Sequence, residues 1–276
     1  MLIRVGHSPD PDDAFMVWAL AEGAVDTRGL EFELVPADIQ TLNEWAPTGR
    51  LEVTALSAAA YPAVQDTYAL LPHGGSFGSG YGPIVVAREP LSRGRLQRTR
   101  IAIPGEQTTA YLVLRLYLGG EFVHDVLPFD EILDAVAEGR SAAGLLIHEG
   151  QLTFAAAGVE KCVDLGEWWL LETGLPLPLG VNTVRRDLGE ETMRTVSAVL
   201  QDAIRLGLER REEALAYALR FGRELDDETV DRFVGMYVNE LTSDPGEEGR
   251  QAVVELYRRA EEFGLAPGGV RVEFVG

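Results

Sequence analysis

The amino-acid sequence predicts a two-lobed α/β protein whose chain crosses twice between the lobes. Three observations support this prediction. The 276 residues are many for one compact core and comfortable for two lobes. Short apolar runs alternate with longer helix-like stretches, which is typical of α/β folds. Two proline-containing stretches, residues 85–100 and 172–187, interrupt the alternation, and we interpret them as the crossovers.

Each predicted strand is a short apolar run that fits a buried sheet. The runs are LIRVG (2–6), EFELVP (31–36), EVTALS (52–57), YALLP (68–72), PIVVAR (83–88), RIAIP (100–104), AAGLLIH (142–148), CVDLG (162–166) and, last, VRVEFV (270–275). Helices are predicted between them at residues 12–23, 108–120 and 129–139. The stretch 108–120 is apolar nearly all round and is therefore expected to be buried. Three or four charged amphipathic helices are expected before the last strand.

The two crossovers divide the chain into discontinuous lobes. We expect residues 1–88 and 182–276 to form one lobe and residues 89–181 to form the other. A protein of this kind has its natural ligand site in the cleft between the lobes.

Composition excludes several classes of partner. With 24 basic and 44 acidic side chains the formal net charge is −20, so nucleic acid and anionic membrane surfaces are unfavourable partners. A small anionic ligand still fits a pocket with local hydrogen-bond donors. Cys162 is the single cysteine and is expected to be a free thiol, so there is no disulfide framework. No signal sequence or apolar run of membrane-spanning length is visible, and we expect a cytoplasmic protein. The sequence carries no signal for oligomeric state.

The stretch GHSPDPDDAF, residues 6–15, has the residues of a helix start. Asp10 is expected to be the N-cap and Pro11 the first helical residue, with Asp12 and Asp13 complementing the helix dipole in the first turn. A metal site is disfavoured because it requires three or four ligands in one geometry, and this pattern gives no such spacing.

The polar loop before that helix has a different significance. His7, Ser8 and Pro9 directly follow a buried strand, and the carboxyl ends of strands are where α/β folds bind ligands. We therefore expect this loop, with Ser8, to form a wall of the site.

Two further strand-to-helix turns carry candidate binding residues. Ser57 ends a strand and is either a simple N-cap or a hydroxyl donor to a ligand; it lacks the Gly-x-Ser-x-Gly pattern of a hydrolase nucleophile. Thr108, Thr109 and Ala110 open the buried helix, where free backbone N–H groups make an anion site. Without a Gly-x-x-x-x-Gly-Lys motif a carboxylate is a better ligand than a nucleotide phosphate.

The glycine-rich stretch 74–83 does not match a dinucleotide-binding pattern. Its glycines either allow the backbone to approach a ligand closely or form an ordinary surface loop.

His148 is the best candidate for a general base. It ends an unbroken apolar strand and is followed by the polar pair Glu149–Gly150, so its imidazole can face a cleft. The alternative is a structural histidine. The chain has four histidines; His124 lies in an ordinary polar turn and His73 beside the glycine-rich stretch.

Several segments together resemble the 1,4-dihydroxy-6-naphthoate synthases of the futalosine route to menaquinone. They are residues 8–15 (SPDPDDAF), Ser57, residues 107–114 (QTTAYLVL) and residues 148–154 (HEGQLTF). The resemblance covers essentially the whole chain. The HEGQLT segment is the more specific motif, because it separates this family from its sister, the chorismate dehydratases.

The resemblance implies a two-lobed, periplasmic-binding-protein-like (type II) fold with two crossover strands and an interlobe cleft. It implies that His148 is the catalytic base and that Ser57, Thr109 and Ala110 hold the carboxylate of the substrate. The family reaction cleaves cyclic dehypoxanthine futalosine into 1,4-dihydroxy-6-naphthoate and dihydroxyacetone. Such a carbon–carbon lyase needs no metal or organic cofactor, and its partner is a small carboxylate.

One departure from the family pattern leaves alternatives open. Asp10 and Asp12 stand where the commoner family form has Cys and Asn. The added negative charge either weakens binding of an anionic substrate or marks a relative with a different ligand. The alternatives to the lyase are a non-catalytic binding protein for a small carboxylate and a chorismate dehydratase-like enzyme.

Overall fold

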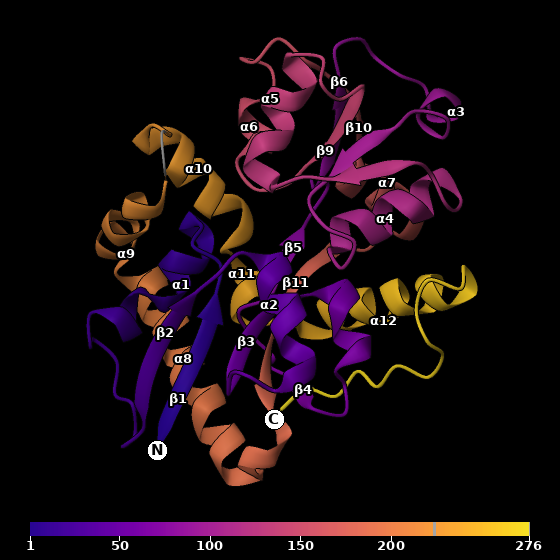
Figure 1. Cartoon of the computed structure of the whole chain (residues 1–276). Helices are drawn as coiled ribbons and strands as arrows, with labels where there is room; N and C mark the ends of the chain where they lie inside the picture. Colours follow the sequence, from indigo (N-terminus) through magenta and orange to yellow (C-terminus); the bar gives the residue numbers. More distant parts are fainter. Residues whose placement is uncertain (223–224, 276) are drawn as a thin grey trace.

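The computed structural model describes residues 1–222 and 225–275 and contains two mixed sheets (Figure 1). In the first sheet the strand order is β2-β1-β3-β11-β4, with β5 also paired to β11. Its strands are β1 (Leu2–His7), β2 (Glu31–Pro36), β3 (Val53–Ser57), β4 (Tyr68–Leu70), β5 (Ser76–Gly78) and β11 (Leu177–Arg185). The order of the second sheet is β10-β6-β9-β7-β8. Its strands are β6 (Ile84–Ala87), β7 (Ile101–Ile103), β8 (His124–Val126), β9 (Ala143–Leu146) and β10 (Glu160–Asp164). The α/β prediction is confirmed.

Helices cover both sheets. Those of the second lobe are α3 (Arg93–Leu96), α4 (Thr109–Leu118), α5 (Ile132–Ala137), α6 (Gly150–Thr153) and α7 (Leu165–Thr173). Those of the first lobe are α1 (Pro11–Ala21), α2 (Ile39–Trp45), α8 (Glu190–Glu209), α9 (Arg211–Ala218), α10 (Asp227–Tyr237), α11 (Glu240–Ser243) and α12 (Gly246–Glu262). Figure 1 shows that the N-terminal and C-terminal segments share the first lobe, while the middle of the chain forms the second.

The chain changes sheets earlier than the sequence suggests. β6 falls within the expected first lobe, 1–88, yet it pairs with β9 and β10 of the second sheet. The first crossing therefore lies in the glycine-rich stretch between β5 and β6, and the prediction that it lies at residues 85–100 is wrong. Pro90 and the basic run that follows instead belong to an exposed connection and the short α3 within the second lobe.

The second crossing lies between α7 and β11, inside the predicted stretch 172–187. β11 begins at Leu177 and pairs with β3, β4 and β5 of the first sheet. The chain thus passes from one sheet to the other near residues 83 and 176, several residues before the expected lobe boundaries at 88 and 181.

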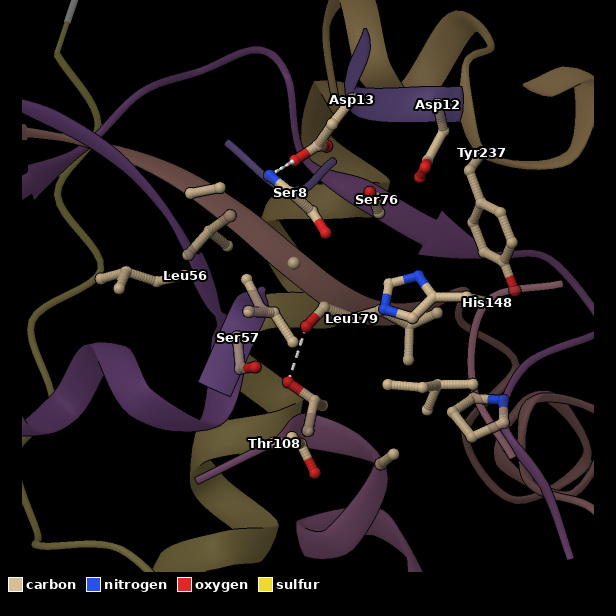
Figure 2. Close-up of a pocket in the computed structure, with 18 of the residues that line it drawn as sticks. Ser8, Asp12, Asp13, Leu56, Ser57, Ser76, Thr108, His148, Leu179 and Tyr237 are labelled. Carbon is tan, nitrogen blue, oxygen red and sulfur yellow. Dashed lines mark hydrogen bonds between the residues drawn. The ribbon is translucent and has the colours of Figure 1, made fainter. Parts of the chain in front are cut away.

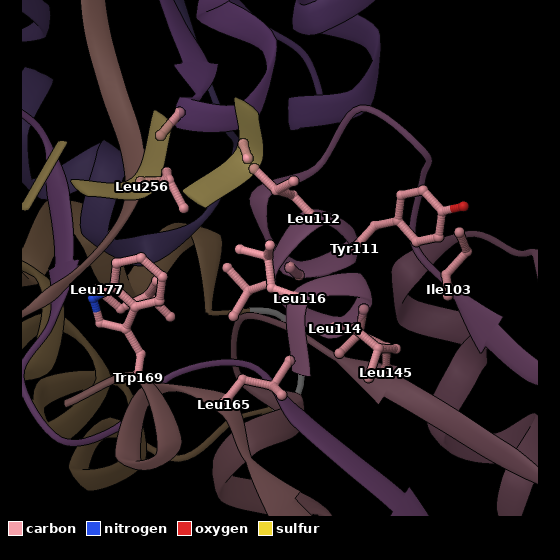
Figure 3. Packing of buried hydrophobic residues seen from close by; sticks show 14 of the residues in the cluster. Ile103, Tyr111, Leu112, Leu114, Leu116, Leu145, Leu165, Trp169, Leu177 and Leu256 are labelled. Carbon is pink, nitrogen blue, oxygen red and sulfur yellow. The ribbon is translucent and has the colours of Figure 1, made fainter. Parts of the chain in front are cut away.

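A hydrophobic cluster continues from one lobe to the other (Figure 3). It includes Leu56 of the first sheet, Leu145 of the second, Trp169 of α7 and Leu256 of α12. Helix α4 lies inside this cluster, and eight of its ten residues are buried, as its apolar sequence predicts. This packing holds the N-terminus of α4 in place beneath the cleft.

The last predicted strand is wrong. Within residues 270–275 only an isolated bridge, between Leu70 and Phe274, joins the segment to the first sheet. The alternating apolar residues there lie against the hydrophobic cluster without extending a ladder. The short strands β5 and β8 were not predicted, because their sequences, SFG and HDV, are not apolar runs.

Candidate active site

A pocket lies between the lobes and brings together all six predicted site residues (Figure 2). Its volume is about 110 Å³. The predicted residues that line it are Ser8, Ser57, Thr108, Thr109, Ala110 and His148. Its lining also includes polar residues that the sequence did not single out for this role: Asp12, Asp13, Ser76, Gln151, Asn182 and Tyr237. Of the glycine-rich stretch, Gly74, Ser76 and Pro83 line the pocket, so this segment is more than a surface loop.

The loop between β1 and α1 supplies one wall, but two of its residues behave differently from expectation. Asp10 occupies the N-cap position of α1, and its side chain makes no capping hydrogen bond. Its carboxylate instead accepts a hydrogen bond from the hydroxyl of Ser8. His7 is buried with Nδ1 2.8 Å from the carbonyl oxygen of Ser8, and it lines a separate small cavity behind the site. The expected capping role of Asp10 and the expected wall position of His7 are therefore wrong.

The first turn of α1 places two carboxyl groups at the pocket, and both retain protons at unusually high pH. Burial, together with the neighbouring carboxylates of Asp13 and Asp10, raises the pKa of Asp12 to about 8. Burial also raises the pKa of Asp13 to about 7, although the backbone N–H of Ser8 donates a 2.6 Å hydrogen bond to it and opposes the shift. Two neighbouring carboxyl groups cannot both ionise without a large electrostatic cost, so Asp12 and Asp13 are partly protonated near neutral pH.

We expect Asp12→Asn to stabilise the protein at alkaline pH. A carboxyl group whose pKa is raised by folding stabilises the native state below its unfolded pKa and loses that contribution as pH rises through the folded value. The wild type should therefore lose stability between about pH 4 and pH 8, whereas the amide does not titrate. Thermal unfolding should show a melting temperature about 5 °C higher for the variant at pH 8.5 and nearly equal values at pH 5, a difference on the order of 2 kcal/mol.

The exposed Asp227, in the first turn of α10, is the matched control. Asp227→Asn removes a helix N-terminal carboxylate without a buried cluster, and its effect should not grow between pH 5 and pH 8.5. A parallel response of both variants would mean that the helix dipole, rather than burial, controls the effect.

The opposite wall consists of Ser57 and the start of α4 (Figure 2). Asn43 fixes Ser57 twice: its Nδ2 donates to the Ser57 hydroxyl at 3.0 Å, and its Oδ1 accepts from the Ser57 backbone N–H at 2.9 Å. Within the described part of the chain no acceptor takes the hydroxyl proton of Ser57. The side chain of Ser57 makes no N-cap hydrogen bond to the short helix that follows, so the expectation of a simple N-cap is wrong.

The hydroxyl groups of the two threonines are already used within the protein. Thr108 is the N-cap of α4; its hydroxyl accepts from the backbone N–H of Tyr111 and donates to the carbonyl of Gly105. The hydroxyl of Thr109 donates to the carbonyl of Leu179 at 2.6 Å and accepts from the N–H of Ala59 at 3.1 Å. What this wall can offer a ligand is therefore the backbone rather than the threonine hydroxyls.

Two backbone N–H groups at this helix end have no acceptor in the described chain. They belong to Thr109 and Ala110, the first residues of a ten-residue helix, whose N–H groups cannot bond within the helix. With the Ser57 hydroxyl they form a set of donors at a positive helix end, which suits a carboxylate. Ala110 thus offers a hydrogen-bond donor to the pocket although its side chain is not polar.

His148 stands at the boundary between the lobes. It follows β9 with a positive φ of 51°, a left-handed backbone conformation that is uncommon for a residue other than glycine. Its ring packs against that of Phe129 in a T-shaped arrangement, with the ring centroids 4.9 Å apart. Its Nδ1 lies 3.3 Å from Oδ2 of Asp10. Its Nε2 is buried and has no hydrogen-bond partner among the described residues, so it is the atom available to a ligand.

Two polar residues beside His148 were missed by the sequence analysis. The hydroxyl of Tyr237 lies 2.8 Å from the side-chain amide of Gln151, and this contact joins α10 of the first lobe to α6 of the second. Burial raises the pKa of Tyr237 well above its usual value, so its hydroxyl stays protonated. Gln151 lies within the HEGQLT motif, which was the available signal; Tyr237 follows apolar helical spacing and looks like a core residue in sequence.

No group of three or more His, Cys, Asp or Glu side chains in residues 1–222 and 225–275 is arranged to hold a metal ion. In the same residues, no helix has the length and apolar character that a membrane span requires.

The fold and the site define a two-lobed protein of the periplasmic-binding-protein type with a polar cleft. The alkanesulfonate-binding protein SsuA from Xanthomonas axonopodis pv. citri has this fold: it is 13% identical, the alignment covers 99% of this chain and 96% of that one, and the TM-score is 0.71. A crystal structure of protein AF1704 from Archaeoglobus fulgidus is 45% identical, with 96% and 98% coverage and a TM-score of 0.91.

The family follows from two further similarities. A family described as "Menaquinone biosynthesis" matches residues 3–262. The 1,4-dihydroxy-6-naphthoate synthase of Thermus thermophilus is 45% identical over 99% of both chains, and that of Streptomyces coelicolor is 38% identical over 96% of this chain and 95% of its own. The chain belongs to this menaquinone-biosynthesis family and is an enzyme of that pathway.

Proposed function

We propose that the protein is a carbon–carbon lyase that converts cyclic dehypoxanthine futalosine into 1,4-dihydroxy-6-naphthoate and dihydroxyacetone, with His148 as general base. The observation that carries this proposal is the state of the imidazole. Its Nε2 is buried at the pocket without a partner, while Nδ1 lies against a carboxylate. An imidazole held in this way directs a nitrogen lone pair at a bound substrate and can accept a proton from it.

The opposite wall orients the substrate. Its carboxylate would bind the Ser57 hydroxyl and the N–H groups of Thr109 and Ala110, at the positive end of α4. Figure 2 shows Ser57 and Thr108 on one side of the pocket and Ser8, Asp12 and Asp13 on the other. An elongated substrate anchored at α4 therefore directs its far end to His148 and the β1–α1 loop.

The chemistry suits an enclosed site. The two products together contain every atom of the substrate, so the reaction requires proton transfers and breaking of one carbon–carbon bond, with no added reactant. Aromatisation of the naphthoate drives the cleavage. Enclosure between the lobes excludes water from the carbanionic intermediate. We place this reaction in the cytoplasm.

Turnover by the purified protein tests the proposal. Incubation with cyclic dehypoxanthine futalosine should release 1,4-dihydroxy-6-naphthoate and dihydroxyacetone in equal amounts, measured by chromatography. Chorismate should remain unchanged in the same preparation. Loss of chorismate would support the dehydratase instead. Binding of a carboxylate without turnover of either compound would support a non-catalytic binding protein.

We expect Ser57→Ala to weaken substrate binding more than catalysis. A hydrogen bond to a charged group contributes roughly 1.5–3 kcal/mol, so KM should rise about 10- to 100-fold while kcat changes little. Steady-state kinetics measures both constants. Ser92→Ala is the control, because Ser92 is an exposed N-cap without a side-chain capping bond. An unchanged KM in the Ser57→Ala enzyme would show that Ser57 does not bind the carboxylate of the substrate.

A further inference from the structure

The catalytic imidazole is bounded by groups from both lobes. His148 follows β9 in the second sheet, whereas Asp10 follows β1 in the first sheet. The 3.3 Å contact between Nδ1 of His148 and Oδ2 of Asp10 therefore spans the cleft. The contact between Tyr237 and Gln151 spans it as well, beside the same imidazole. The lobes thus meet on the side of the pocket that carries the base.

The carboxylate of Asp10 is held in place from its own lobe. The residue is 1% exposed, and the hydroxyl of Ser8 donates a hydrogen bond to the same Oδ2 atom that faces His148. It stands at the N-cap of α1 but does not cap the helix. Its side chain is therefore directed across the cleft toward His148 instead of capping α1.

The second lobe holds the ring of His148 by an aromatic contact. Phe129, from the same lobe, packs against the imidazole in a T-shaped arrangement. In the described chain, the ionic partner recorded for the imidazole is Asp10, from the other lobe. Which ring nitrogen carries the proton in neutral histidine is decided by the partner of the other nitrogen. Separation of the lobes would therefore remove the Asp10 carboxylate, the group that determines which nitrogen of His148 carries the proton.

We propose that Asp10 is a positioning residue that completes His148 across the cleft, so that the base is assembled only while the lobes are together. The carboxylate holds the proton on Nδ1 and leaves the lone pair of Nε2 facing the substrate. When the lobes are apart, Asp10 does not hold the proton on Nδ1 of the imidazole. Proton removal from the substrate therefore requires the lobes to close. This inference rests on the proposed role of His148 as general base. It adds that Asp10 positions the imidazole and that closure of the lobes brings the two residues together.

Two measurements test the role of Asp10. Asp10→Asn preserves the shape of the side chain but removes the anionic acceptor, and we expect kcat to fall about 100-fold with KM changed by less than about threefold. In the His148→Ala background the same substitution should cause no further loss of turnover, because Asp10 acts through the imidazole. Asp227→Asn, on the exposed start of α10, should match the wild type.

A spectroscopic readout is independent of turnover. In ¹⁵N-histidine spectra the wild type bound to 1,4-dihydroxy-6-naphthoate should show His148 protonated at Nδ1, and Asp10→Asn should shift it toward a mixture of tautomers. Wild-type kcat and an unchanged tautomer in Asp10→Asn would overturn the inference, as would an equal loss in the His148→Ala background. Absence of turnover in the wild type would instead overturn the proposed function, and the spectra would still decide the contact. If Asp10→Asn does not fold, a wild-type His148 lacking the Nδ1 proton is sufficient to reject the inference.

Discussion

Replacement of His148 by alanine is expected to lower kcat by about 10²- to 10⁴-fold, the range that a positioned general base contributes. The wall around Ser57, which we propose binds the carboxylate, lies on the other side of the pocket and should still bind the product. Truncation removes the imidazole with its contacts to Asp10 and Phe129 but leaves the Ser57 wall in place, so the product dissociation constant should stay within about threefold of the wild-type value. Steady-state turnover and calorimetric titration with 1,4-dihydroxy-6-naphthoate measure the two quantities.

His124 provides the control for this substitution. It begins β8, contacts Glu106 at 2.8 Å and is absent from the lining of the pocket. His124→Ala should retain turnover near that of the wild type. If His148→Ala kept the wild-type kcat, another group would have to remove the proton, and the assignment of the base would fail.

Gly166→Ala is expected to destabilise the protein by about 3 kcal/mol, at the upper end of the usual cost of overpacking. Gly166 lies in the first turn of α7, directly against the segment that carries the first crossing. A Cβ atom there would lie 2.0 Å from the carbonyl oxygen of Tyr81 and 2.1 Å from its carbon. Both are backbone atoms, so rotation of a side chain cannot relieve the clash. Thermal unfolding should show a melting temperature roughly 6–12 °C lower.

Gly94 allows the same substitution without a clash. It lies in helix α3, and an added Cβ would meet no atom within 4 Å. Gly94→Ala should leave stability unchanged or raise it slightly, since alanine favours helix and restricts the unfolded chain. Equal losses in both variants would show that the contact with the crossing segment is not the cause.

The predicted strands and the buried helix α4 follow from patterns that act over a few residues. An apolar run bounded by turn residues predicts a strand wherever its faces are buried, and the runs around β1, β3 and β9 were therefore found. The first crossing was misplaced because Pro90 and its basic neighbours are typical of any exposed connection. The true crossing depends on close backbone packing between Gly82 and Gly166, and sequence alone does not reveal which glycines meet.

In the candidate site, too, some features could be predicted from local sequence and others depend on the fold. Ser57 ends a strand, and Ser8, the start of α4 and His148 come after strands; α/β folds place ligands at these strand ends, and all of these residues line one pocket. The helix-start motif placed Asp10 at the N-cap correctly, but only the fold shows that its carboxylate faces His148. Tyr237 was missed because its apolar helical spacing is that of a core residue.

The sequence by itself determined the class of fold, the ends of the strands that carry the site and the family to which the chain belongs. These depend on hydrophobic periodicity, turn residues and motif spacing, which are local properties of the chain. The tertiary structure decided where the chain crosses between the sheets and which side chains meet across the cleft. Those contacts join segments of opposite lobes, as between Asp10 and His148, and depend on how two separately formed sheets pack together.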